Sequence, residues 1–177
     1  IGKPLSPYAV TKYVNELYAD VFARCYGFNT IGLRYFNVFG PRQDPSSQYS
    51  AVIPLFIMKA LVGEGPTIDG DGEQTRDFTY IENAVRANLL ACTATPAAVS
   101  GEVFNVGCGE QISVNQLWEA IQEATGVRVD SVTGPTREGD VRDSLASLDK
   151  IQGQMSYSVT VSLTEGLRRT VESLARS

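Results

Sequence analysis

Tyr8 and Lys12 are the first residues of the chain whose types and spacing could do chemistry. They lie in the segment SPYAVTKYVNELYADVFARCYGF, and residues four apart share one face of a helix. Tyrosine is a weak base at neutral pH, but a nearby ammonium group favours its ionised form. The pair could therefore remove a proton from a hydroxyl group as a general base. The same spacing is common among ordinary surface residues, so by itself it predicts chemistry only weakly.

The composition restricts the chemistry further. The 177 residues contain no histidine, which removes histidine-based triads and histidine zinc sites, and we expect no metal site. A net charge of −5 argues against general nucleic-acid binding. No apolar run reaches the roughly 20 residues that a membrane span needs. From the charge and the run lengths together, we expect neither nucleic acid nor membrane as a partner. Cys25, Cys92 and Cys108 form no CxxC motif and are predicted to be reduced core residues of a cytoplasmic protein.

The pattern of apolar residues predicts helices and strands in alternation. Ser6 and Pro7 start a helix that Gly27 ends, residues 29–36 form a buried strand, and residues 37–50 form a loop. The remaining predicted elements are a helix at 52–62, two short strands within 63–81, helices at 82–94 and 113–125, strands at 102–106 and 127–132, a short helix, and a last helix from about Leu163. This order is typical of an α/β fold.

Several motifs around and after the Tyr-Lys pair occur in a recognisable order. YAVTK is followed by RYFNVFGPRQDP, then by DGDGEQTRDFTYIEN and TREGDVRDS. Over essentially the whole chain these motifs resemble the extended short-chain dehydrogenase/reductase family, in particular its NAD-dependent nucleotide-sugar epimerases and dehydratases. Within this family the chain resembles in particular the bacterial UDP-N-acetylglucosamine 4-epimerases. The resemblance implies the C-terminal part of an NAD(P)-binding Rossmann-like fold plus a small α/β substrate-binding domain. Residues 1–40 would be the last part of the Rossmann-like domain, and 41–177 mainly the nucleotide-sugar-binding region, interleaved with it.

The resemblance also implies a role for individual residues. Tyr8 would be the base and later the acid at the sugar 4-hydroxyl, while Lys12 would hold the nicotinamide ribose and favour ionised Tyr8. The other implied contacts are Tyr35, Phe36 and Asn37 at the nicotinamide, with Asn37 also at the diphosphate; Ala51 and Val52 at the diphosphate and uracil; Thr67 and Asp69 at the uracil; Arg76 and Arg137 at the diphosphate; Phe78, where some relatives have tyrosine; Asp140 at a ribose hydroxyl; and Ser144 beside the sugar. Arginine suits this task because its fork of donors matches phosphate oxygens.

Two parts of the family's machinery are expected upstream of Tyr8. These are the glycine-rich turn that binds the dinucleotide and the Ser or Thr that completes the catalytic triad. We therefore expect this chain to have little activity and no tight NAD binding alone. Gly107 and Gly109 also follow a predicted strand, but Ile112 occupies the third glycine position, so a simple turn is expected there. The acidic run from Asp69 to Glu73 lacks the spacing of a calcium loop.

The resulting hypothesis is a UDP-sugar 4-epimerase that uses NAD and a 4-keto intermediate, as part of a longer enzyme. Small Ser144 would leave room for a 2-N-acetyl group, which favours UDP-GlcNAc and UDP-GalNAc as substrates, with UDP-glucose and UDP-galactose as a second pair. A homodimer through the helix of Tyr8 and Lys12 is expected. Two alternatives stay open: a nucleotide-sugar 4,6-dehydratase or UDP-glucuronate decarboxylase, and an inactive fragment that binds UDP-sugars or dimerises.

Overall fold

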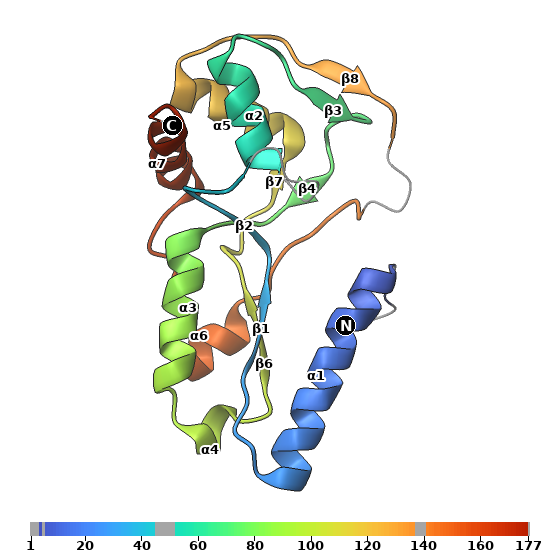
Figure 1. Ribbon diagram of the computed structural model, residues 1–177, viewed down its shortest axis with the longest axis vertical. Coiled ribbons are helices and arrows are strands. Elements are labelled where there is room, and N and C mark those ends of the chain that lie inside the picture. Colours follow the sequence, from blue (N-terminus) through green and yellow to red (C-terminus); the bar gives the residue numbers. More distant parts are fainter. Residues whose placement is uncertain (1–3, 5, 45–51, 137–140, 177) are drawn as a thin grey trace.

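The structure is a computed structural model that describes residues 4, 6–44, 52–136 and 141–176. Ala51, Arg137 and Asp140, to which the sequence assigns substrate contacts, lie outside these residues. The elements are α1 (Pro7–Tyr26), β1 (Gly32–Tyr35), β2 (Asn37–Phe39), α2 (Val52–Leu61), β3 (Thr67–Asp69), β4 (Thr75–Arg76), β5 (Phe78–Tyr80), α3 (Ile81–Thr93), α4 (Pro96–Val99), β6 (Val103–Val106), β7 (Ile112–Ser113), α5 (Val114–Thr125), β8 (Val132–Gly134), α6 (Asp149–Met155) and α7 (Leu163–Leu174). The predicted α/β class is confirmed (Figure 1).

Helix α1 begins and ends where the sequence predicts. The Ser6 side chain accepts a hydrogen bond from the Ala9 N–H at 3.2 Å, which satisfies one of the free donors of the first turn. Gly27 ends the helix with a left-handed φ of 63°, a conformation that glycine adopts without steric cost. In Figure 1 this helix stands on one side of the β1 and β6 strands, with α3 and α6 on the other side.

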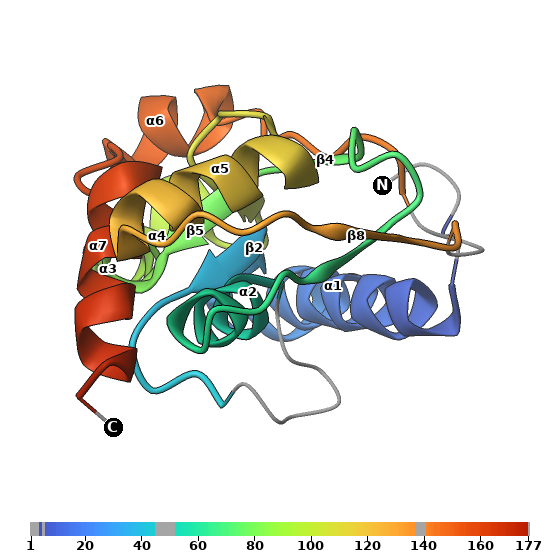
Figure 2. The ribbon, with the colours of Figure 1, turned by 90° about the horizontal axis from the view of Figure 1, so that it is seen from above.

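The strands pair two by two. β1 pairs in parallel with β6, β2 with β5, and β3 with β8, while β4 and β7 are antiparallel. The chain therefore changes partner strand at Phe36, between β1 and β2. Seen from above, α1 and α2 lie toward one side of the molecule, and α5 and α6 toward the other (Figure 2).

Among the described residues, two hydrophobic clusters form the core. The first joins α2, α5 and α7 to β2 and β5, and Phe39 and Leu117 are among its fully buried members. The second joins β6, α3 and α6, with fully buried Phe104 among its members and Phe36 packed against it. Buried Asn83 on α3 links α3 to the segment that precedes α7: its side-chain oxygen accepts from the Val161 N–H at 3.1 Å, and its amide donates to the Val161 carbonyl at 2.8 Å.

Some predicted elements are corrected by the structure. Residues 37–39 were expected in a loop but form β2, and 127–132 was expected as a strand whereas β8 lies at Val132–Gly134. The region 63–81 holds three short strands rather than two, and α4 and β7 were not predicted. These strands are two to three residues long and pair with segments far away in the sequence. Their local sequences therefore carry little of the information that forms them.

The cysteine prediction is wrong in part. All three cysteines are free thiols, but Cys25 and Cys92 are exposed and only Cys108 is partly buried. Burial, followed by the negative charge of Asp77, raises the pKa of Cys108 to about 11. Its thiol is therefore uncharged at neutral pH.

Gly166 on α7 provides a test of the packing. A Cβ added there would lie 2.8 Å from ring atoms of both Phe39 and Tyr80. We expect Gly166→Ala to lower the free energy of unfolding by about 1–3 kcal/mol, because overpacking outweighs the gain in helix propensity. Gly153 on α6 is the matched control, since nothing lies within 4 Å of its added Cβ. Gly153→Ala should stabilise by about 0.5–1 kcal/mol in the same urea titration. Equal effects of the two variants would contradict this packing.

Candidate active site

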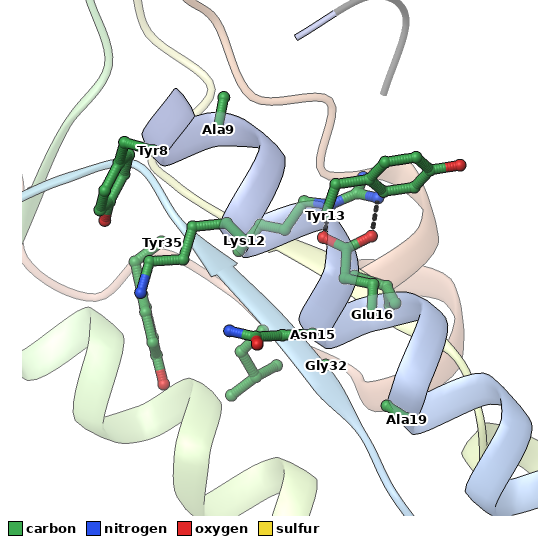
Figure 3. A pocket seen from close by; sticks show the side chains of 12 residues that line it. Tyr8, Ala9, Lys12, Tyr13, Asn15, Glu16, Ala19, Gly32 and Tyr35 are labelled. Carbon is green, nitrogen blue, oxygen red and sulfur yellow. Dashed lines mark hydrogen bonds and ion pairs between the residues drawn. The ribbon is translucent and has the colours of Figure 1, made fainter. Parts of the chain in front are cut away.

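Tyr8 and Lys12 open onto a pocket between α1 and β1 (Figure 3). The pocket has a volume of about 690 Å³, and Asn15 and Tyr35 also line it. The Lys12 ammonium lies 5.1 Å from the centre of the Tyr8 ring, a cation–π distance. The Tyr8 side chain is 69% exposed, so a molecule in the pocket could reach it. The structure thus brings together the predicted base, its cation and Tyr35.

Tyr35 is held by helix α3. Its hydroxyl donates to the side-chain oxygen of Asn88 at 2.9 Å, and the Asn88 amide donates to the carbonyl of Ala84 at 2.8 Å. Phe36, the next residue, instead packs against the second core cluster. Of these two neighbours, only Tyr35 lines the pocket beside Lys12.

Helix α1 is fixed to β1 by a bidentate ion pair. The Arg34 guanidinium donates to both carboxylate oxygens of Glu16, at 2.6 and 2.5 Å. Such paired, charge-assisted bonds fix orientation as well as distance. The hydrogen bond to Glu16 raises the pKa of Arg34. This pair, which sequence reasoning missed, sets where the Tyr8 and Lys12 helix lies relative to Tyr35.

A second group of predicted residues gathers around β4 and β5. The Asn37 N–H donates to the Asp77 carbonyl at 3.0 Å, and the Ser144 N–H donates to the Thr75 carbonyl at 3.2 Å. Arg76 lies between these two carbonyl-bearing residues in the chain. Phe78 follows directly but is buried, with 3% of its surface exposed, so its ring belongs to the first core cluster.

The remaining predicted residues lie on neighbouring elements. Val52 opens α2, and Thr67 and Asp69 are the first and last residues of β3. The elements α2, β3 and β4 all lie in the upper part of Figure 1. Their roles at the uracil and diphosphate stay predictions.

An exposed ion pair connects the turn after β3 to the segment after residue 140. The Arg142 guanidinium donates to both carboxylate oxygens of Asp71, at 2.8 and 3.0 Å. This lowers the pKa of Asp71 from 3.8 to about 2. Because the folded-state pKa is depressed, the contribution of the pair is present above pH 3.8 and is lost as the pH falls through about 2.

The turn at Gly107 and Gly109 is a packing turn, as expected. The N–H groups of Cys108 and Gly109 both donate to the Asp77 carboxylate, at 2.7 and 2.9 Å, so they are not free for a phosphate. A Cβ added at Gly107 would lie 2.5 Å from the Cβ of Ala146. The glycine there allows close packing against protein rather than approach to a dinucleotide.

The described residues hold neither a metal-binding cluster nor a membrane-spanning helix. In the part of the chain that the structure describes, no group of three or more acidic or cysteine side chains is placed to hold a metal ion. No helix in the described ranges combines the length and apolar character that crossing a membrane requires.

The sequence of the chain assigns it to a known family. Residues 1–107 match the family described as "NAD dependent epimerase/dehydratase family". The chain therefore belongs to this family. The solved structures that are similar to this chain have a Rossmann-like fold.

Individual relatives agree with this assignment. The structure of UDP-glucose 4-epimerase from Thermotoga maritima with UDP-glucose is 43% identical, with a TM-score of 0.93 over 98% of this chain and 55% of that chain. UDP-N-acetylglucosamine 4-epimerase from Methanobrevibacter ruminantium, solved with UDP-N-acetylmuramic acid, is 40% identical with a TM-score of 0.90, over 98% and 55% of the two chains. UDP-glucose 4-epimerase from Mycolicibacterium smegmatis is 34% identical over 96% of this chain and 53% of its own length.

Other relatives show that the family includes further reactions. They include a dTDP-glucose 4,6-dehydratase and a UDP-N-acetyl-α-D-glucosaminuronate decarboxylase. The chain spans about half the length of the curated relatives it matches.

Proposed function

We propose that this chain is the substrate-binding half of an NAD-dependent UDP-sugar 4-epimerase. The proposal rests on residues 35–37, which connect the pocket to the strand segment that carries Arg76. Tyr35 lines the pocket with Tyr8 and Lys12, and Asn37, two residues later, is hydrogen bonded to the strand segment that carries Arg76. A UDP-sugar with its diphosphate at Arg76 would therefore direct its sugar toward Tyr8.

Each residue has a chemical task in this proposal. Tyr8 takes the proton of the sugar 4-hydroxyl and later returns it, while Lys12 places its ammonium group 5.1 Å from the centre of the Tyr8 ring and holds the nicotinamide ribose. Arg76 holds the diphosphate through charge-assisted hydrogen bonds. Asn88 and the Arg34–Glu16 pair keep Tyr35 and α1 in place around the sugar. The 4-keto sugar rotates within this pocket before its 4-hydroxyl is restored.

The pocket residues fit the nicotinamide end of the cofactor. An ammonium group at Lys12 can bond ribose hydroxyls, and the exposed Tyr35 ring offers a flat wall. NAD, when bound, would accept and return the hydride of the sugar carbon. The Gly107 turn has its N–H groups committed to Asp77, so it offers no second dinucleotide site. We therefore expect tight NAD binding to require residues beyond this chain.

Calorimetry on the chain itself separates the two ligands. UDP-GlcNAc is expected to bind the 177-residue chain, whereas NAD is expected to show no tight binding. Absence of UDP-GlcNAc binding would contradict the proposed nucleotide-sugar site. Tight NAD binding would contradict the proposal that residues beyond this chain are needed to hold NAD tightly. The dehydratase and decarboxylase alternative shares the motifs of this half, so it is decided by the reaction product.

The proposed enzyme is a homodimer through α1. No residue of α1 is buried, and a stripe of aliphatic side chains on it is 38–48% exposed: Val10, Val14, Leu17 and Val21. These residues recur three and four apart and so share one helix face. Contiguous exposed apolar surface of this kind is typical of an interaction site.

The dimer can be tested by sedimentation velocity of the chain. Leu17→Glu would place an unpaired charge in the interface and is expected to weaken self-association at least about 100-fold. Val159→Glu is the control, because Val159 is 37% exposed and lies outside α1. If Leu17→Glu left the association unchanged, or if both variants weakened it equally, α1 would not be the interface.

A further inference from the structure

We infer that Asp77 is the positioning residue of the proposed nucleotide site, which consists of Asn37, Arg76 and Ser144, and that its buried carboxylate sets the affinity of this site for a nucleotide diphosphate. This inference rests on the proposed function. Asp77 follows Arg76 directly, and its side chain is fully buried. A buried carboxylate is costly unless hydrogen bonds compensate it, so its partners show what it holds together.

The partners of the carboxylate come from two separate segments. One oxygen accepts from the Cys108 N–H at 2.7 Å. The other accepts from the Gly109 N–H at 2.9 Å and from the Ala146 N–H at 3.3 Å. Asp77 therefore joins the turn after β6 and the segment that carries Ser144 to its own strand region.

The backbone of Asp77 adds a third segment. Its carbonyl accepts from the Asn37 N–H at 3.0 Å, at the start of β2. Asn37 thus bonds to Asp77 directly, Arg76 precedes Asp77 in the chain, and Ser144 lies two residues before Ala146. All three predicted contact residues are therefore close to Asp77 or to a residue that it binds.

The packing around the carboxylate leaves little room for adjustment. A Cβ added at Gly107 would lie 2.7 Å from one Asp77 oxygen and 2.5 Å from the Ala146 Cβ. Gly107 therefore allows the turn to approach the carboxylate. Arg76 is covalently next to this buried carboxylate, and its guanidinium also donates to the carbonyl of Thr75 at 2.7 Å.

Two variants test the inference through different changes at the same junction. Asp77→Asn replaces an acceptor oxygen by an NH₂ group that faces backbone donors, while Gly107→Ala pushes on the carboxylate without removing its charge. Ile121→Ala is the control for lost stability, because Ile121 is fully buried in the first core cluster on α5. All three are measured in the 177-residue chain, with UDP as the probe.

Binding of UDP is the first measurement, by ¹H–¹⁵N NMR titration at a temperature where every variant is folded. Asp77→Asn and Gly107→Ala are expected to raise the dissociation constant of UDP between about 10-fold and 100-fold, since displaced binding groups lose affinity steeply. Ile121→Ala should change it less than about 3-fold. If Ile121→Ala weakened UDP binding as much as the other two, Asp77 would have only a stability role.

Amide hydrogen exchange is the second measurement and needs no ligand. In Asp77→Asn, exchange should accelerate at Cys108, Gly109 and Ala146, and also at Asn37 and Ser144. Acceleration confined to Cys108 and Gly109 would overturn the inference. If the unchanged chain failed to bind UDP, the proposed function would fail, and the exchange pattern would still decide whether Asp77 positions these segments.

Discussion

Replacing Tyr8 with phenylalanine is expected to lower the turnover number of the intact enzyme by about 10²- to 10⁴-fold. This is the range that a positioned general acid–base group contributes. By the intact enzyme we mean this chain together with the cofactor-binding half that we propose. Phenylalanine keeps the ring beside Lys12 and removes only the hydroxyl. Binding of UDP-GlcNAc to the variant should therefore be unchanged.

The control is Tyr18→Phe on the same helix. Tyr18 is 63% exposed, close to the exposure of Tyr8, but it does not line the pocket. Turnover by Tyr18→Phe should match that of the unchanged enzyme. A Tyr8→Phe variant that kept more than about a tenth of the activity would show that another group moves the proton.

The second large effect concerns substrate choice at Ser144. This half-buried residue lies beside β4, since its N–H donates to the carbonyl of Thr75, which precedes Arg76. We expect Ser144→Tyr in the intact enzyme to lower kcat/KM for UDP-GlcNAc by about 100-fold, because the phenol ring would occupy the space of the 2-N-acetyl group. The value for UDP-glucose should change less than about 3-fold.

Ser147→Tyr controls for the added bulk. Ser147 is exposed and lies three residues later in the same segment. Its variant should treat both substrates as the unchanged enzyme does. If Ser144→Tyr left turnover of UDP-GlcNAc intact, the proposed pocket for the N-acetyl group would be wrong, whereas the 4-epimerase proposal itself would stand.

Local signals account for the parts of the fold that the sequence predicts well. Ser6 and Gly27 mark the ends of α1 through hydrogen bonding and backbone conformation within a few residues, and both predictions are confirmed. The capping box of Ser113 and Gln116 marks α5 in the same way. β2 was missed because its formation depends on pairing with β5, about forty positions further along the chain.

The same distinction between local signals and long-range contacts applies to the candidate site. Spacing alone places Tyr8 and Lys12 on one helix face, and only the family resemblance adds Tyr35, Arg76 and Ser144. The contacts that hold the site join residues far apart in the sequence: Glu16 to Arg34 across 18 positions, and Asp77 to Ala146 across 69. No periodicity reports such contacts. The one local sign of Asp77 is a carboxylate inside the β-rich run TRDFTY.

The most direct test of the central claim follows the sugar H1 and H4 signals by NMR. The intact enzyme is incubated with UDP-GlcNAc and, separately, with UDP-glucose. The proposed 4-epimerase should form UDP-GalNAc, and faster than it forms UDP-galactose. A stable 4-keto sugar or a pentose product would contradict the proposal and assign the chain to the dehydratase or decarboxylase branch of the family. No conversion of either substrate would also contradict it.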